Sequence, residues 1–122
     1  MATKSNGTVT SARAADMSRL EANALRASAL LKAMANPTRL MVLCQIADGE
    51  KSVGELEEAV GLSQSALSQH LAVLRTRRVV TARRVGQTIY YSLTSPEAAS
   101  VMGTLYEVFC RKVGKSSRMK AA

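Results

Sequence analysis

The feature that most constrains this chain is a pair of short helices joined by a tight turn, predicted between residues 52 and 75. The stretch SVGE at residues 52–55 has the form of a capping box, in which a serine and a glutamate close the first turn of a helix. Gly61 is expected to end that helix, and Ser63 to cap the next one. Two short helices that meet across a glycine-containing turn indicate a helix-turn-helix.

Further helices and one β-hairpin are predicted around this motif, and there are no internal repeats. Apolar residues at helical spacing, an Asn-Pro helix start and β-prone runs on either side of a glycine set the boundaries. The predicted elements are helices over 17–34 and from 36 to Gly49, strands at 79–84 and 88–93 around the turn 85–87, and a last helix that begins at 95–96. The predicted fold class is mainly α with a small β-hairpin.

Length and composition predict one folded domain in a basic protein. The chain has 122 residues, 47% of them hydrophobic, and a formal net charge of +8, which suggests an anionic partner. We expect a disordered leader at 1–16, the folded domain at 17–112 and a basic, flexible tail at 113–122. The chain shows neither an apolar run of about 20 residues, as a membrane span needs, nor a signal peptide, so we expect a soluble, cytoplasmic protein.

The second helix of the motif is predicted to carry two contrasting faces. With about 100° per residue, Leu67, Leu71 and Leu74 form a buried stripe. Small, uncharged polar side chains fall at the N-terminal end and on the opposite side: Gln64, Ser65, Ser68 and Gln69. Such groups can hydrogen-bond to base edges in a major groove, although the same face could also be merely solvated.

A cluster of basic residues follows this helix. Five arginines occur within ten residues, without one acidic residue: Arg75, Arg77, Arg78, Arg83 and Arg84. A basic hairpin beside a reading helix is typical of a wing that contacts phosphates or the minor groove. A solvated charged face is the alternative, but together with the helix-turn-helix the cluster favours binding to double-stranded DNA.

Three stretches together resemble the ArsR/SmtB family of bacterial winged helix-turn-helix repressors. They are LKAMANPTRLMVLCQI, SVGELEEAVGLSQSALSQHLAVLR and RRVGQTIYYSL, and the resemblance covers about residues 20 to 110. It implies a homodimer paired through the first and last helices, which binds an inverted repeat and loses DNA affinity when an inducer binds. By position it places on the operator the polar residues Gln64, Ser65, Ser68, Gln69 and His70, and at the wing tip Arg84, Gly86 and Gln87.

The chain departs from the metal-sensing members of this family. Where many carry Cys-x-Cys in the first helix of the motif, this sequence has ELEE at 55–58. Others bind zinc through Asp and His on the last helix, but residues 100–110 contain neither. His70 is the only histidine and lies in the reading helix, so no metal site and no cofactor are predicted.

The two cysteines, Cys44 and Cys110, resemble the pair of the SqrR/BigR/HlyU branch of the family. That resemblance implies a thiol switch that answers reactive sulfur species such as a persulfide or polysulfide. Basic Arg111 and Lys112 favour a thiolate at Cys110, while the helix C-terminus opposes it, and Cys44 is expected to be the more buried thiol. Without the resemblance, two ordinary buried cysteines would be the simpler interpretation.

The function predicted is therefore that of a DNA-binding regulator, most simply a repressor, and not of an enzyme. A soft-metal or arsenite sensor using both thiols remains an alternative, as does an anti-silencing activator of the haemolysin-regulator type. An architectural DNA-binding protein that senses nothing is a further alternative. A thiol oxidoreductase is disfavoured because the chain has no Cys-x-x-Cys, no obvious general base and no cofactor loop.

Overall fold

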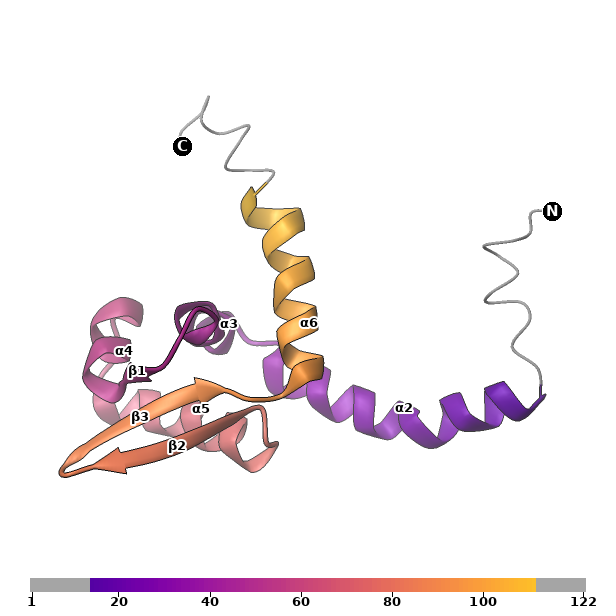
Figure 1. Cartoon of the computed structure of the whole chain (residues 1–122), viewed down its shortest axis with the longest axis horizontal. Helices are drawn as coiled ribbons and strands as arrows, with labels where there is room; N and C mark the ends of the chain where they lie inside the picture. Colours follow the sequence, from indigo (N-terminus) through magenta and orange to yellow (C-terminus); the bar gives the residue numbers. More distant parts are fainter. Residues whose placement is uncertain (1–13, 112–122) are drawn as a thin grey trace.

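The computed structural model describes residues 14–111, which form a mainly helical domain with a small antiparallel sheet (Figure 1). The predicted tail and all but the last three residues of the predicted leader lie outside this range. The elements are α2 (Ala14–Met34), α3 (Pro37–Ile46), β1 (Lys51–Ser52), α4 (Val53–Val60), α5 (Gln64–Thr76), β2 (Val80–Val85), β3 (Thr88–Leu93), α6 (Pro96–Leu105) and the π-helix η1 (Tyr106–Arg111).

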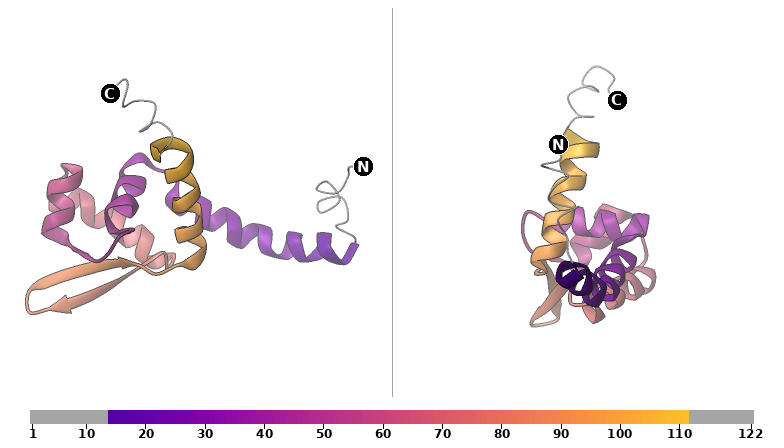
Figure 2. Two further views of the ribbon diagram at one scale, coloured as in Figure 1. Left: turned by 45° about the horizontal axis from the view of Figure 1, so that its top comes forward. Right: turned by 90° about the vertical axis from the view of Figure 1, so that its right-hand side faces the viewer.

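Helices α3, α4 and α5 cluster at one end of the molecule, and the β2–β3 hairpin extends beside them. Helix α2 runs away from this cluster in the opposite direction, and α6 rises between the two parts (Figures 1 and 2). The core joins the inward faces of these elements. It consists of Ala33, Met34, Val42, Leu43, Ile46, Leu56, Leu67, Leu71, Leu74, Val79, Val80, Tyr91, Ala98 and Met102.

The predicted caps at Asn36, Ser52 and Gly61 are confirmed, but the helix that was expected to run to Gly49 ends at Ile46, with Ala47 as its C-cap. Asn36 accepts a hydrogen bond from the Arg39 amide at 3.0 Å, and Ser52 and Glu55 form both halves of the capping box. Gly61 ends α4 in the left-handed conformation, with φ of 69°, which an L side chain adopts at a cost. The prediction that the first helix starts at residue 17 was three residues late, because alanines and an acidic first turn favour a start at 14.

The sheet contains one strand that the sequence did not predict. Its order is β1-β3-β2, and β1 pairs antiparallel with β3, so that Lys51 faces Tyr91 and Ser52 faces Tyr90. A strand of two residues is too short to show apolar alternation, and tertiary pairing alone defines it. The hairpin turn is also tighter than predicted, since Val85 already pairs with Thr88.

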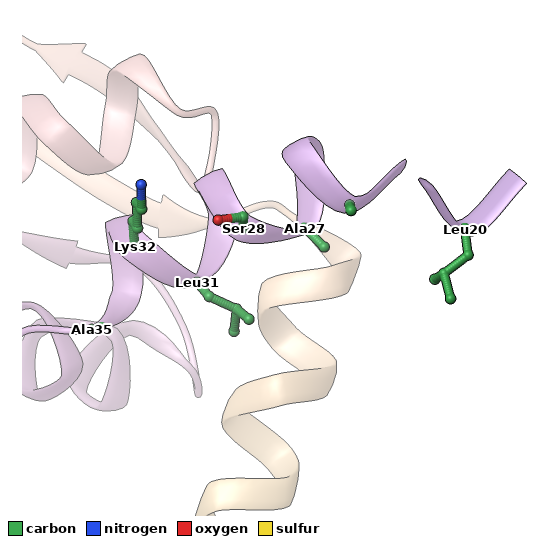
Figure 3. Close-up of a pocket in the computed structure, with 7 residues that line it drawn as sticks. Leu20, Ala27, Ser28, Leu31, Lys32 and Ala35 are labelled. Atoms are coloured by element: carbon green, nitrogen blue, oxygen red, sulfur yellow. The ribbon is translucent and has the colours of Figure 1, made fainter. Parts of the chain in front are cut away.

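Both ends of the described chain leave large apolar side chains exposed. The α2 residues Leu20 and Leu31 are 61% and 52% exposed, and Tyr106 and Phe109 of η1 are 57% and 64% exposed. A shallow hollow of about 580 Å3 runs along α2, and Figure 3 shows Leu31 and Ala27 pointing to the side where α6 rises. Within residues 14–111, no helix is long and apolar enough to cross a membrane.

Candidate nucleic-acid interface

The N-terminal end of α5 is held open to solvent by its local sequence. Ser63 caps the helix by accepting a hydrogen bond from the Ala66 amide at 3.2 Å. The left-handed turn at Gly61 turns the chain sharply between α4 and α5. This turn places the first residues of α5 at the surface while the rest of the helix packs on α3 and α4.

The two faces of α5 are as the helical spacing predicts. The three leucines Leu67, Leu71 and Leu74 are at most 1% exposed and anchor the helix in the core. The uncharged polar side chains of its first turns are all exposed: Gln64, Ser65, Ser68 and Gln69. We call these four residues the reading face, because nothing in the described chain covers them and their amides and hydroxyls can donate and accept.

His70 lies apart from the reading face. Its ring is half-buried, and Nδ1 lies 3.2 Å from Nη1 of Arg39 on α3. A guanidinium can only donate, so Nδ1 is the acceptor and the neutral ring carries its proton on Nε2. The nearer ring nitrogen is therefore engaged inside the protein rather than directed at a ligand.

The two wing arginines lie in different surroundings because adjacent residues of a strand face opposite sides. Arg83 forms a two-pronged pair with Glu50, with Nη2–Oε1 at 2.7 Å and Nε–Oε2 at 2.9 Å, and lies 5.0 Å from the centre of the Tyr90 ring. The hydrogen bonds from Arg83 lower the pKa of the Glu50 carboxyl. Arg84 is exposed and makes no hydrogen bond or ion pair with another described residue.

The wing tip is built from Gly86 and Gln87, both exposed. Gly86 has φ of 63°, as the first position of a two-residue hairpin turn of type II′ requires. The strand pairing up to Val85 and Thr88 projects this tip away from the core. Arg84 and the tip therefore form one exposed, basic end of the hairpin.

The arginines at the C-terminal end of α5 occupy three distinct environments. Arg75 donates from Nη1 to the hydroxyl of buried Tyr91 at 3.3 Å. Arg77 is exposed at the C-cap of α5. Arg78 has φ of 61° and ends the helix in a left-handed turn, with the Val79 amide donating to the Leu74 carbonyl at 2.9 Å.

Both cysteines are free and exposed, with Cys44 on α3 and Cys110 on η1. Cys44 was expected to be the more buried thiol. It is exposed, because Val42, Leu43 and Ile46 form the buried face of α3 and Cys44 lies on the other side. Partial burial raises the pKa of the Cys44 thiol, and repulsion from Cys110 raises it further. Cys110 therefore influences the ionisation of the Cys44 thiol. Among residues 14–111 there is no group of three or more His, Cys, Asp or Glu residues placed to hold a metal ion.

Comparison with known proteins agrees with this geometry. Residues 36–82 match the model of the bacterial regulatory protein family arsR. The transcriptional activator HlyU of Vibrio cholerae is 46% identical over 96 residues, which cover 79% of this chain and 89% of the relative. The chain belongs to the ArsR family. A biofilm growth-associated repressor of Xylella fastidiosa is 44% identical, with 75% of this chain and 80% of that protein covered.

Solved structures of ArsR-family members share the fold. Reduced HlyU from Vibrio cholerae superposes with a TM-score of 0.74 at 47% identity, covering 76% of this chain and 98% of that one. The repressor BigR from Xylella fastidiosa gives a TM-score of 0.71 at 42% identity, covering 77% and 96%. The protein is a winged helix-turn-helix transcription regulator with a DNA-binding motif, and ArsR-family regulators typically act as dimers. The family contains regulators rather than enzymes, which removes the oxidoreductase alternative.

Two polar residues of this site were missed by the sequence analysis. Glu50 could not be assigned to Arg83, because only the fold brings together residues 33 positions apart. Arg39 carried a usable signal. It lies two residues after Pro37, at a helix junction where a proline leaves a carbonyl without its usual donor.

Proposed function

We propose that α5 and the wing read an inverted-repeat operator as a homodimer, and that the regulator is a repressor. The observation that carries this proposal is the exposed reading face, which lies opposite three buried leucines on a helix capped by Ser63. Such a helix can enter a major groove with its N-terminal end. The exposed Arg84 and the Gly86–Gln87 tip would then contact the backbone or the minor groove beside it.

The two ends of the described chain support the pairing part of the proposal. Leu20 and Leu31 on α2, with Tyr106 and Phe109 on η1, expose apolar area that a monomer would leave in water. A second copy related by a two-fold axis would cover the same area on both chains. Two reading helices would then face two half-sites about one helical turn apart.

Operator binding separates the roles proposed for the helix and the wing. Gln64→Ala should lower the preference for the operator over unrelated DNA, because an amide that pairs with a base edge carries sequence information. Arg84→Ala should weaken binding to all sequences and reduce the salt slope by about one unit, because it would meet one phosphate. Thr81→Ala, an exposed change on β2 away from the tip, is the matched control.

We further propose that Cys44 and Cys110 form a switch that responds to a persulfide. The Cys110 thiolate attacks the outer sulfur of R–S–SH, so that the S–S bond breaks, RS⁻ leaves and Cys110 becomes a persulfide. The Cys44 thiolate then attacks the inner sulfur of that persulfide, which forms a Cys44–Cys110 disulfide and releases HS⁻. The persulfide is the oxidant, and the two thiols supply the two electrons.

The effect of Cys110 on the pKa of Cys44 supports the two thiols taking part in one reaction. Repulsion from Cys110 contributes to the raised pKa of Cys44, although the two residues lie far apart in sequence. Both sulfurs are exposed, so a small persulfide can reach either. A bridge would join α3 to η1, and thus the side of the DNA-binding motif to the apolar end that the proposed dimer uses.

Gel shifts with the operator test the switch. Persulfide should add an intraprotein bridge, seen as a loss of two hydrogens by mass, and release the wild-type protein from DNA. Cys44→Ser and Cys110→Ser should stay bound under the same treatment. If both variants dissociate as the wild type does, the dithiol switch is wrong.

Two alternatives become outcomes of the same assays. Release by arsenite or a soft metal, with no release by persulfide, would identify a thiol-based metal sensor instead. Transcription in vitro decides the sign of regulation, since one relative is named an activator and another a repressor. Activation only on DNA coated with nucleoid protein would indicate anti-silencing.

A further inference from the structure

Arg39 is the point where three helices of the described chain meet. It lies near the start of α3, its side chain is half-buried, and its guanidinium reaches both the end of α2 and the side of α5. None of these contacts involves the reading face, the wing or the cysteines.

The end of α2 shows why an arginine is needed there. The last four carbonyls of a helix lack partners within the helix, and here two of them are bonded by the chain that follows. The Ala35 amide donates to Leu31 at 2.8 Å, and the Asn36 amide donates to Met34 at 2.8 Å. The carbonyls of Lys32 and Ala33 remain.

Pro37 leaves Ala33 without a donor, because proline has no amide hydrogen at the position that would continue the helix. The Asn36 amide is already used by Met34. Arg39 supplies both missing donors, with Nε at 2.6 Å from the Ala33 oxygen and Nη2 at 3.4 Å from the Lys32 oxygen. Its side chain thus closes the C-terminus of α2.

The third nitrogen of the same guanidinium, Nη1, donates to Nδ1 of His70 at 3.2 Å. A planar guanidinium fixes its donors in one rigid plane, so the two carbonyls on one side determine where the His70 ring must lie on the other. His70 follows Gln69 of the reading face on α5. A shift of α2 would therefore be passed to α5 through one side chain.

We propose that Arg39 is a positioning residue that acts through His70 to hold the reading face of α5 in register with α2. The proposal rests on α5 being the helix that reads DNA. Since α2 also carries the apolar side chains Leu20 and Leu31, the same link ties the placement of each reading helix to dimer pairing. In this role His70 accepts a hydrogen bond from Arg39 at Nδ1 and does not contact a base.

Two substitutions of His70 distinguish this role from a direct DNA contact. In His70→Asn the amide oxygen takes the place of Nδ1, whereas in His70→Gln the amide group extends one bond further, toward the place of Nε2. Arg39→Lys keeps the charge but replaces the fork by a single ammonium. Arg26→Lys is the matched control, since Arg26 is an exposed α2 residue that bonds only Asn23, at 3.2 Å, within its own helix.

The quantity to measure is the ratio of operator affinity to affinity for unrelated DNA, together with the salt slope and a thermal melt of each variant. We expect His70→Asn to keep the ratio within about twofold, and His70→Ala, His70→Gln and Arg39→Lys to lower it about tenfold, which is about 1.4 kcal/mol. The salt slope should not change, because no phosphate contact is lost. Arg39→Lys should cost nothing more in the His70→Ala background.

Rescue by Gln rather than Asn, or losses that add in the double variant, would overturn the link. Gln64→Ala is measured beside the series to separate this failure from that of the proposed function. A lowered ratio for Gln64→Ala with an unaffected His70 series overturns only the link. A ratio unchanged in both overturns the link and the reading role of α5 together.

Discussion

The DNA-binding part of the molecule and its two extended ends differ in how completely their apolar side chains are buried and their polar groups are hydrogen-bonded. In α4, α5 and the hairpin, caps are closed, the leucines of α4 and α5 are buried, and the one ion pair described there holds a wing strand. In α2 and η1, large apolar side chains lie open to solvent. The difference teaches that the folding of α4, α5 and the hairpin, here called the head, can be specified by one chain, whereas the ends leave apolar area that the proposed dimer would cover.

The largest contrast between the two regions should appear when one leucine of each is shortened. Leu67→Ala removes a side chain that is 0% exposed and should lower the free energy of unfolding by about 3 kcal/mol. Leu20→Ala, at 61% exposure, should change it by less than about 0.5 kcal/mol at protein concentrations too low for pairing. Chemical denaturation measures both, and equal losses would remove the distinction between head and ends.

The second largest effect is expected on dimer formation, when a charge is placed on the exposed apolar face of α2. Leu20→Glu places a charge on the apolar stripe of α2 and should raise the dimer dissociation constant at least about tenfold, because the carboxylate would be buried without a partner. Sedimentation equilibrium measures this constant. Ser18→Glu is the control, since residue 18 lies about 160° around the helix from Leu20. Equal weakening by both variants would indicate a general charge effect rather than a specific apolar contact.

A smaller effect is expected at the cap that begins the DNA-binding motif. Ser52→Ala removes the hydroxyl that accepts from the Glu55 amide at 3.1 Å and should cost about 1 kcal/mol of stability. Ser68→Ala, an exposed serine in the interior of α5, should stay within about 0.5 kcal/mol of the wild type. Thermal unfolding compares the two, and a cap variant as stable as the Ser68 variant would contradict the role of the box.

The regions also differ in how far the sequence could predict them. Local signals defined the head, because the Ser52–Glu55 box, the Gly61 turn and the leucine spacing of α5 act within a few residues of each other. Strand β1 was not predicted because two residues are too few to show apolar alternation, and the strand is defined only by its pairing with β3. Arg83 was predicted to bind DNA, but its partner Glu50 comes from a distant part of the chain, so only the folded structure shows the pair.

The ends were correctly predicted to be helical, but the π-helix at the C-terminal end and the exposed position of Cys44 were not predicted. The last helix was expected to continue through Phe109, but residues 106–111 form a π-helix. The spacing of apolar residues does not predict this wider helical turn. Cys44 was expected to be the more buried thiol because it shares a helical stripe with Leu40 and Ala47. The neighbouring Leu43 takes the buried position instead, and one step of about 100° moves Cys44 to the surface.

The smallest expected effect is a change in the pKa of Cys44 when Cys110 is replaced. The pKa of Cys44 is raised first by burial and then by repulsion from Cys110, so Cys110→Ser should move it down without returning it to the ordinary thiol value. Because a raised thiol pKa favours the neutral form, this group stabilises the fold below the pKa of the unfolded thiol, and the contribution is lost as pH rises through the folded value. The rate of Cys44 alkylation against pH reports the shift, with urea-unfolded protein as the reference. A midpoint that Cys110→Ser leaves in place would mean that the two sulfurs do not approach in solution, and η1 would then have no chemical link to the head.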